Sequence, residues 1–476
     1  MVEGAMVLNP VSDEITAKLR AALPPQAFRE ASARYFEEPR GRYAGQAGLV
    51  LAPSTTDEVA RVMRIASDHA TPVIPYGGGT GLVGGQIAEA LPAPIVLSFE
   101  RMAALRAGFA EENVIIAEAG AVLADIQAKA REMGRLFPLS LASEGSARIG
   151  GVLATNAGGV NVLRYGNARD LCLGLEAVLA DGRVWHGLSR LRKDNAGYDL
   201  RDLLIGSEGT LGIITAASLK LAPVPAEQGT AIFTFPSPGA ALSLLALAKD
   251  QVGEGVSAFE LIHKQGFAFL AETLPEVRQP FAELPEWCAL IDLGLPLGLK
   301  APAAFEALFV AAQAAGLAQD AVIAQSEAQR GDLWRVREQI PEANRRIGSV
   351  SSHDISLPLS AIPEFIERAG PRLAQLGMFR INCFGHVGDG NLHYNVFPLP
   401  GRARADHENE RPAIKQVVHD LVDEMGGSVA AEHGVGRLKV DDLERYGDPT
   451  LLSMMRSVKG ALDPKGILNP GVVLRG

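Results

Sequence analysis

Two histidines, His386 and His393, lie within the segment GHVGDGNLHYN (385–395). In a straight strand their Cα atoms would be about 23 Å apart, and in a helix about 10 Å. The residues between them, GDGN (388–391), are typical of a turn, because glycine, Asp and Asn tolerate positive φ. We therefore expect the chain to reverse there and to bring both imidazoles to one place, where they can share a ligand.

A glycine-rich segment, GGGTGLVGG (77–85), follows the apolar pattern TPVIPY and contains a literal G-x-G-x-x-G, with Glu100 about 20 residues on. A Rossmann unit needs a crossover helix after such a loop. Only GQIAEALPAP (85–94), with two prolines, precedes the next strand pattern. We therefore reject the Rossmann interpretation. The exposed backbone N–H groups still predict a nest for an anion such as a pyrophosphate.

The composition limits the class of protein. The chain has 476 residues, 47% hydrophobic and 21% charged, typical of a soluble protein of two or three domains. A net charge of −10 argues against a nucleic-acid partner. We find no apolar run of about 18 residues and no signal peptide. Three scattered cysteines, Cys172, Cys288 and Cys383, fit a reducing compartment. We expect a cytoplasmic protein, with peripheral attachment to the inner membrane as the alternative.

The hydrophobic patterns change near residue 225. The earlier region has α/β character with many short strands, including a strand–turn–strand at LEAVLADGRVW (175–185). Strand patterns then occur at 231–235, 257–262, 288–294 and 321–324, with helices near 238–250 and 302–316. This β-α-β-β-α-β order predicts a ferredoxin-like arrangement. Longer helices are expected near 326–346 and 413–427, followed by a final loop at 462–474.

Several motifs together carry a family resemblance. The segments 75–86, 143–167 and 192–215 resemble the FAD-binding domain of the vanillyl-alcohol-oxidase/p-cresol-methylhydroxylase superfamily. The segments GHVGDGNLHYN, AAEHGVG and DPKGILNPG are similar to its FAD-linked D-2-hydroxyacid dehydrogenase branch, which includes D-lactate, D-2-hydroxyglutarate and glycolate dehydrogenase subunits. The resemblance implies an α+β fold, with a two-subdomain FAD-binding domain (1–224), a ferredoxin-like α+β cap or substrate domain (225–425) and a C-terminal segment (426–476) that returns to the FAD domain.

The resemblance also implies where FAD binds. Three groups of residues would hold the pyrophosphate, the flavin with its ribityl chain, and the adenosine end, and Asn469 would close over the isoalloxazine ring. In that order they are Pro75, Gly77, Gly78, Gly79, Thr80, Gly81, Leu82, Gly85 and Gln86; Ser143, Gly145, Ile149, Gly150, Thr155, Asn156, Gly158 and Gly159; and Glu208, Gly212, Ile213 and Ile214. No histidine lies in the pyrophosphate loop or in 143–166, so we expect non-covalent FAD.

By the same resemblance, His386, His393 and Glu432 hold one divalent ion, zinc or manganese. Two imidazoles and a carboxylate form a catalytic type of metal set with open positions. His433 is the expected general base, which takes the hydroxyl proton with help from the metal while hydride passes from Cα to flavin N5. Glu432 and His433 are adjacent, so the backbone must bend, which Gly434 and Gly436 permit.

The substrate carboxylate requires a cation. Arg337 matches the substrate arginine of the family pattern, Asn395 would donate to the substrate, and Arg335 is expected to be a solvated helix charge. Pro341 and Ser352 stand where diacid-specific members are expected to have a hydroxyl residue and a lysine. Without these groups a second carboxylate lacks partners, so we favour a D-lactate-like substrate. D-2-hydroxyglutarate dehydrogenase and a glycolate oxidase-type subunit are the alternatives.

Two other classes of function stay open. One is a flavin-free metallohydrolase, which leaves the glycine-rich half without a role. The other is an idle subunit that binds FAD, for which the metal set has no use. We see no NAD site and no iron–sulfur cysteine cluster. Electrons are therefore expected to leave to electron-transfer flavoprotein, a quinone or a cytochrome, and a homodimer is among the assemblies considered.

Overall fold

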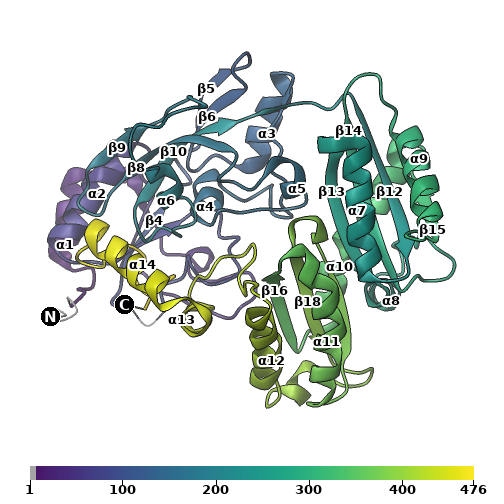
Figure 1. Cartoon of the computed structure of the whole chain (residues 1–476). Helices are drawn as coiled ribbons and strands as arrows, with labels where there is room; N and C mark the ends of the chain where they lie inside the picture. The colour runs from purple at the N-terminus through teal and green to yellow at the C-terminus, as the bar shows by residue number, and fades with distance from the viewer. Residues whose placement is uncertain (1–6, 90, 476) are drawn as a thin grey trace. The chain divides into compact units, whose positions relative to one another are not determined.

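The computed structural model describes residues 7–89 and 91–475, which form two compact units (Figure 1). Unit 1 contains the chain up to residue 158, residues 167–224 and the chain from residue 433 onward. Unit 2 contains residues 159–166 and 225–432. The chain enters unit 2 at Pro225, next to the predicted boundary, and re-enters unit 1 at His433 rather than at 426. The division also assigns the short segment 159–166 to unit 2.

The first sheet of unit 1 has the order β1-β2-β4-β3, formed by β1 (Phe28–Arg29), β2 (Leu49–Leu51), β4 (Ile95–Ser98) and β3 (Val73–Tyr76). Helices α1 (Asp13–Ala22) and α2 (Thr56–Asp68) bury their apolar faces in the core beside it. Strands β3 and β4 are parallel neighbours, yet no helix occurs among the described residues between them. This confirms that the glycine loop does not open a Rossmann helix.

The second sheet of unit 1 is antiparallel, in the order β5-β6-β10-β8-β9. Its strands are β5 (Leu105–Phe109), β6 (Val114–Glu118), β10 (Ile213–Lys220), β8 (Cys172–Val178) and β9 (Val184–Gly187). The predicted turn between β8 and β9 is confirmed, with Gly182 at φ +79°. The remaining α-helices and strands of unit 1 are α3 (Leu123–Glu132), β7 (Arg135–Leu136), α4 (Ile149–Ala154), α6 (Leu200–Leu204), β11 (Ala222–Pro223), α13 (Val440–Tyr446) and α14 (Pro449–Leu462).

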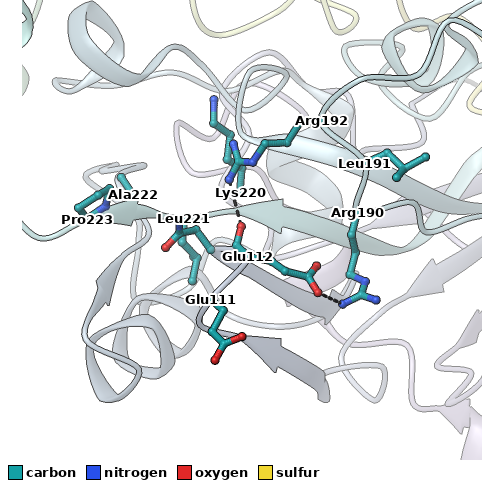
Figure 2. Close-up of a pocket in the computed structure, with 10 residues that line it drawn as sticks. Glu111, Glu112, Arg190, Leu191, Arg192, Lys220, Leu221, Ala222 and Pro223 are labelled. Carbon is teal, nitrogen blue, oxygen red and sulfur yellow. Dashed lines mark hydrogen bonds and ion pairs between the residues drawn. The ribbon is translucent and has the colours of Figure 1, made fainter.

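A surface hollow lies at one edge of this second sheet, lined by residues 111–113, 190–192 and 220–223 (Figure 2). Two arginines that line this hollow are bound to Glu112 of the same chain. Arg190 pairs with the Glu112 carboxylate at 2.7 Å, and Arg192 donates to the Glu112 carbonyl at 3.1 Å. None of the predicted site residues lines this hollow.

The C-terminal tail returns to the first sheet, as predicted. After α14, the Val73 amide donates to the Ile467 carbonyl at 2.8 Å, and the Asn469 amide donates to the Val73 carbonyl at 3.0 Å. The tail thus lies beside β3, the strand that leads into the glycine loop, and Asn469 reaches that loop.

Unit 2 is built on a seven-stranded antiparallel sheet of order β15-β12-β14-β13-β17-β18-β16. Its strands are β12 (Glu227–Phe235), β13 (Val256–His263), β14 (Trp287–Leu295), β15 (Asp320–Ile323), β16 (Ser351–Ser356), β17 (Arg380–Gly385) and β18 (Asn391–Phe397). The first four confirm the ferredoxin-like alternation, with α7 (Pro238–Val252) and α9 (Ala301–Ala314) as its helices. The sequence patterns missed α8 (Lys264–Thr273), which lies between β13 and β14 in the chain, and strand β17.

Helices cover the two faces of this sheet differently. Helices α8 and α10 (Glu327–Ile347) pack on one face, against a core that includes Ile262 and Phe384. On the other face, α11 (Ile362–Ala374) contacts Tyr394 through Phe365, and α12 (Arg411–Glu424) contacts His353 through His419. Because side chains alternate along a strand, His393 and Asp354 point to the same side of the sheet as Phe384. The short α5 (Val162–Tyr165) completes unit 2.

Candidate functional site

The turn between β17 and β18 brings the two histidines together, as predicted. A single 3₁₀ turn, Val387–Asp389, reverses the chain, and Gly390 follows at φ +91°. A Cβ at Gly390 would lie 2.5 Å from the Leu357 carbonyl oxygen, so only glycine fits. The imidazole centroids of His386 and His393 are 5.6 Å apart. The pair therefore faces one point.

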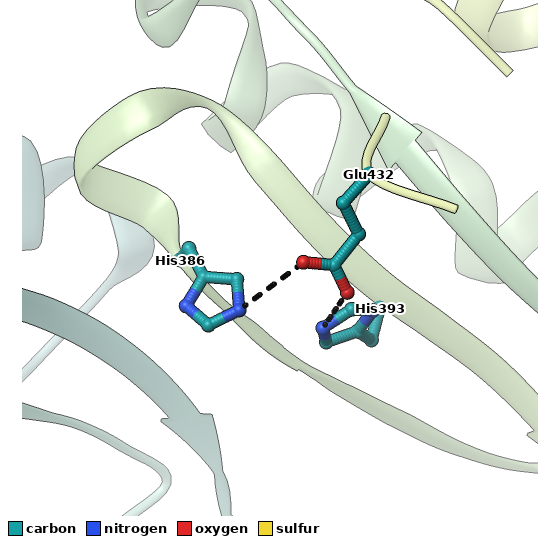
Figure 3. A group of neighbouring side chains, drawn as sticks. All are labelled: His386, His393 and Glu432. Carbon is teal, nitrogen blue, oxygen red and sulfur yellow. Dashed lines mark ion pairs between the residues drawn. The ribbon is translucent and has the colours of Figure 1, made fainter. Parts of the chain in front are cut away.

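Glu432 completes a three-residue group with these histidines (Figure 3). Its carboxylate oxygens lie 3.7 Å from His386 Nε2 and 3.6 Å from His393 Nε2. Two ligand atoms at about 2.1 Å from a tetrahedral ion would be about 3.4 Å apart. The three ligand atoms all lie within 4.8 Å of one another, so their spacing suits a divalent ion after small side-chain adjustments.

A buried carboxylate lies behind His386. Glu260 Oε1 lies 2.6 Å from His386 Nδ1, and Glu260 Oε2 accepts from Arg337 Nε at 2.8 Å. A Nδ1–H bond to a carboxylate leaves Nε2 with its lone pair facing Glu432, which is the tautomer that a metal requires. Burial alone would raise the pKa of Glu260, but the electrostatic and hydrogen-bond interactions with His386 and Arg337 outweigh it and hold that pKa well below its usual range.

The pKa values of two neighbouring groups are shifted as well. Burial lowers the pKa of His386, but the Glu260 carboxylate has the larger net effect and raises it. For Asp389, which lies in the turn, burial raises the pKa to about 6. Titratable groups whose pKa values are shifted by burial and by one another thus surround the three-residue group.

Asp354 supports Glu432 from the edge strand β16. Its Oδ1 accepts from Asn391 Nδ2 at 3.0 Å, and its Oδ2 accepts from the backbone amide of Glu432 at 3.2 Å. The side chain is buried, so both contacts form away from bulk water. Asp354 therefore fixes the backbone that carries Glu432. Sequence reasoning did not single out this residue, although an acid within the apolar strand pattern HDISLP was the available signal.

The predicted substrate-binding residues lie on α10 and β18. Arg337 is buried, with its guanidinium carbon 4.9 Å from the centroid of the Phe384 ring, whereas Arg335 is exposed as predicted. Asn395 is buried on the same side of β18 as His393 and donates from Nδ2 to the His393 carbonyl at 3.3 Å. Arg337 is thus linked through Glu260 to the three-residue group, a connection that sequence reasoning missed.

Within unit 1, the predicted pyrophosphate loop packs tightly against the segment around α4 that is predicted to line the flavin and its ribityl chain. A Cβ at Gly78 would lie 2.1 Å from the Ser146 carbonyl oxygen, and one at Gly77 would contact Gly151. Gly79 adopts φ +73°, and Gln86 Nε2 donates back to the Gly81 carbonyl at 2.9 Å. Residues 77–82 are all partly exposed, so backbone groups remain accessible to an anion, as the nest interpretation requires.

Asn469 provides an independent test of whether a cofactor fits here. Its Nδ2 donates to the carbonyls of Gly85 and Glu208, at 2.9 and 2.8 Å. Its Oδ1 is buried and finds no donor among the described residues. A buried acceptor without a partner is costly unless a bound group satisfies it. Asn469 also adopts φ +41°, a conformation that asparagine tolerates better than most other residues with a side chain. The residues present therefore fit a bound FAD.

Glu208 makes contacts within unit 1 that the sequence did not indicate. Its carboxylate accepts from the amides of Val435 at 2.8 Å and Gly436 at 2.8 Å, so both oxygens bind the loop that follows His433. Burial raises the pKa of this carboxyl to about 7. Glu208 thus binds the C-terminal segment through two hydrogen bonds. Its expected contact with the adenosine end of FAD stays a prediction.

The remaining predicted residues occupy four places. Pro75 lies in β3 just before its last residue, Tyr76, and Thr80, Leu82 and Gly85 lie in the loop that follows. Ser143, Gly145, Ile149, Gly150, Thr155, Asn156 and Gly158 lie in and around α4 in unit 1, whereas Gly159 belongs to unit 2. Gly212, Ile213 and Ile214 lead into β10, where Ile213 packs in the apolar core. His433 follows Glu432 directly and is partly exposed.

Among the described residues, no helix combines the length and the apolar character that a membrane span requires.

Comparison with known proteins gives consistent matches along the chain. Residues 47–187 match the family described as FAD binding domain, and residues 224–473 match FAD linked oxidases, C-terminal domain. The chain is 35% identical over 433 residues to the mitochondrial D-2-hydroxyglutarate dehydrogenase of Arabidopsis thaliana, covering 91% of this chain and 76% of that protein. It is 37% identical over 426 residues to the Bos taurus enzyme of that name, covering 90% and 76%. It is 35% identical over 424 residues to the Xanthomonas citri pv. viticola D-2-hydroxyglutarate dehydrogenase, covering 89% and 88%.

Solved structures agree on the fold. Substrate-bound p-cresol methylhydroxylase superposes with a TM-score of 0.78 at 17% identity, covering 98% of this chain and 99% of that chain. The 4-ethylphenol oxidase from Gulosibacter chungangensis superposes with a TM-score of 0.70 at 18% identity, covering 98% of both chains. The chain therefore has the fold of these structures and belongs to the family of FAD linked oxidases that includes the D-2-hydroxyglutarate dehydrogenases above, as an FAD-linked oxidoreductase that acts on CH–OH groups.

Proposed function

We propose that this protein oxidises a small D-2-hydroxyacid to the corresponding 2-oxoacid, with a divalent ion, zinc or manganese, held by His386, His393 and Glu432. The observation that carries this proposal is the convergence of two imidazoles and one carboxylate within 4.8 Å. A buried carboxylate orients one of the imidazoles, as is usual for metal-binding histidines. Membership of the family does not by itself require these contacts. They therefore support metal binding independently of the comparisons with known proteins.

The two bound groups would supply complementary chemistry. FAD supplies an acceptor for the hydride that leaves the substrate Cα, at flavin N5. A divalent ion supplies a Lewis acid that makes the substrate hydroxyl more acidic and polarises the product carbonyl. We propose that FAD is bound non-covalently, by the glycine loop, the α4 segment and Asn469. Acid or heat should then release it from the protein.

His433 is the proposed general base for the hydroxyl proton. It follows Glu432 directly, and Gly434 at φ +77° and Gly436 at φ +54° provide the bend that the sequence predicts. The two amides held by Glu208 fix the loop just after His433. This anchoring fixes the backbone close to His433, and a base held in position favours proton transfer.

Arg337 and Asn395 are proposed to bind the substrate. Arg337 contacts Glu260 through Nε, and its planar guanidinium suits a bidentate carboxylate. Asn395 carries an amide donor on the same side of β18 as His393. Together they would hold the carboxylate and the hydroxyl of a 2-hydroxyacid in a fixed orientation.

We favour a D-lactate-like substrate over a diacid because the two positions expected to serve a second carboxylate carry Pro341 and Ser352, neither of which is a cation. Pro341 and Ser352 are both exposed, and the Ser352 hydroxyl bonds that of Ser349 at 2.7 Å. Arg345 and Arg346 are each bound to Glu342, at 2.7 and 2.9 Å. These arginines would have to leave that carboxylate to serve a diacid.

A D-2-hydroxyglutarate substrate is the second candidate, because the relatives described above carry that enzyme's name. A glycolate oxidase-type subunit is a third. Family membership argues against a flavin-free metallohydrolase, and the assembled three-residue group argues against an idle FAD-binding subunit. A panel of D-2-hydroxyacids with an artificial dye acceptor decides among them: D-lactate should give the highest kcat/KM, and a clearly higher value for D-2-hydroxyglutarate would overturn our preference.

The physiological acceptor, location and assembly are proposals of the same kind. We propose electron-transfer flavoprotein, a quinone or a cytochrome as acceptor, a cytoplasmic location with peripheral attachment to the inner membrane as the alternative, and a homodimer as a candidate assembly. The names of the plant and animal relatives state a mitochondrial location for those proteins. Fractionation of the native host and light scattering of the purified protein test the location and the assembly.

A further inference from the structure

We infer that Glu260 is a positioning residue that sets the orientation of the metal-binding histidine and of the substrate-binding arginine at the same time. The inference rests on the proposed function, since the roles of His386 and Arg337 come from it. Neither the motifs nor the family resemblance points to Glu260; the inference depends on contacts between residues far apart in the sequence.

The placement of Glu260 requires strong partners. It lies in the middle of β13 (Val256–His263), flanked by Phe259 and Leu261, and its side chain is 1% exposed. A buried carboxylate is unfavourable unless charged or hydrogen-bonding groups replace its water shell. The registers of β13 with β17 and of β17 with β18 put Ile262, Phe384 and His393 in one row on one face of the sheet. Glu260, two residues before Ile262, points to this same face.

Each oxygen of Glu260 holds a different functional side chain. Oε1 lies 2.6 Å from His386 Nδ1, on the side of the ring opposite the nitrogen that faces Glu432. Oε2 accepts from Arg337 Nε at 2.8 Å. One carboxylate therefore fixes the histidine tautomer and the plane of the guanidinium, and a change at Glu260 should disturb metal binding and substrate binding together.

The same sheet face supplies a matched control. Asp292 on β14 is also a buried carboxylate, and it also binds an arginine of α10, Arg330, at 3.1 Å. Thr230 and Trp334 donate to the same carboxylate, and no residue of the three-residue group contacts it in the described structure. Replacing Asp292 removes a comparable buried charge, so it measures the general cost of such a change without touching the metal-binding histidine.

The test compares Glu260→Gln, Glu260→Asp and Asp292→Asn with the wild-type holoenzyme. After the protein is stripped with chelator and FAD is restored, Zn²⁺ affinity is measured by competition with a coloured chelator, and steady-state kinetics are measured with D-lactate. We expect Glu260→Gln to bind Zn²⁺ about 10–100-fold more weakly, the usual effect of losing a carboxylate behind a metal-binding histidine. KM should also rise about 10-fold, FAD content should be unchanged, and Glu260→Asp should lie between Gln and wild type.

Asp292→Asn should keep its Zn²⁺ affinity within about twofold of wild type. Wild-type Zn²⁺ affinity in Glu260→Gln, or an equal loss in Asp292→Asn, would overturn the positioning role. Selective ¹⁵N-histidine NMR of the wild-type protein gives a second test that does not depend on a variant folding: His386 should carry its proton on Nδ1, and a proton on Nε2 would contradict the inference. If Glu432→Ala binds Zn²⁺ as tightly as wild type, the proposed metal site itself fails, a result distinct from a failure confined to Glu260.

Discussion

The hydrogen bonds of Glu208 to the loop after His433 lead to a prediction about how stability depends on pH. Its carboxylate is buried and accepts from the amides of Val435 and Gly436. Burial raises the pKa of this group from 4.5 to about 7, against the opposing effect of these two hydrogen bonds. We consider the substitution Glu208→Gln, which keeps the size of the side chain and removes the ionisation.

The sign of the effect follows from the direction of the shift. The folded protein binds this proton more tightly than the unfolded chain, so the group stabilises the fold below pH 4.5. That stability is lost as the pH rises to 7. A rise of the pKa from 4.5 to about 7 corresponds to about 3 kcal/mol, most of which falls between pH 5 and pH 8. The Gln variant cannot ionise and should not show this loss.

The assay is urea unfolding of wild type and Glu208→Gln at pH 5, 6, 7 and 8 with excess FAD. Unfolding is monitored by the fluorescence of Trp185 on β9 of unit 1. The other two tryptophans, Trp287 and Trp334, are first replaced by Phe in both proteins. The difference in free energy of unfolding, variant minus wild type, should rise by about 2–3 kcal/mol over this range. Parallel pH profiles for the two proteins, or a wild type that gains stability relative to the variant at high pH, would refute the reasoning.

Three further predictions concern the active site. His433→Ala should keep the metal but slow flavin reduction by roughly 10²–10⁴-fold, the usual contribution of general-base catalysis; loss of the metal in this variant would instead make His433 a ligand. Ser352→Lys should shift kcat/KM toward D-2-hydroxyglutarate by about 1–3 kcal/mol relative to D-lactate, the scale of a charge-assisted hydrogen bond, and an unchanged ratio would show that this position does not contact the substrate tail. Acid precipitation should leave FAD in the supernatant, whereas a yellow pellet would indicate a covalent flavin.

Local chemistry made part of the site predictable from the sequence. The turn between His386 and His393 depends on four consecutive residues, and Gly390 at φ +91° shows why glycine is needed there. The strand and helix patterns of the ferredoxin-like part were also readable, because their periodicity is local. Glu432 entered through family resemblance, since nothing near it in the sequence indicates a partner on β17 or β18.

The rest depends on long-range pairing that periodicity does not encode. Glu260 and His386 are 126 positions apart, and they meet because β13 pairs with β17. The visible signal was an acid in the middle of an apolar strand, which marks a buried charge but does not name its partner. Resemblance indicated only a cofactor contact for Glu208, and the hydrogen bonds of its carboxylate to the loop after His433 had no local signal in the sequence. Strand order thus decided which charged groups face one another.

The central claim is that flavin reduction by a D-2-hydroxyacid depends on a metal held by His386, His393 and Glu432. The most direct measurement is anaerobic stopped-flow mixing of D-lactate with the holoenzyme, before and after chelator treatment and again after Zn²⁺ or Mn²⁺ is restored. We expect rapid bleaching of the oxidised-flavin absorption band in the metal-loaded enzyme. After the metal is stripped, this bleaching should be lost while the flavin spectrum stays intact. Added metal should restore the bleaching in wild type but not in Glu432→Ala. Full-rate bleaching by enzyme verified to be free of metal would contradict the claim.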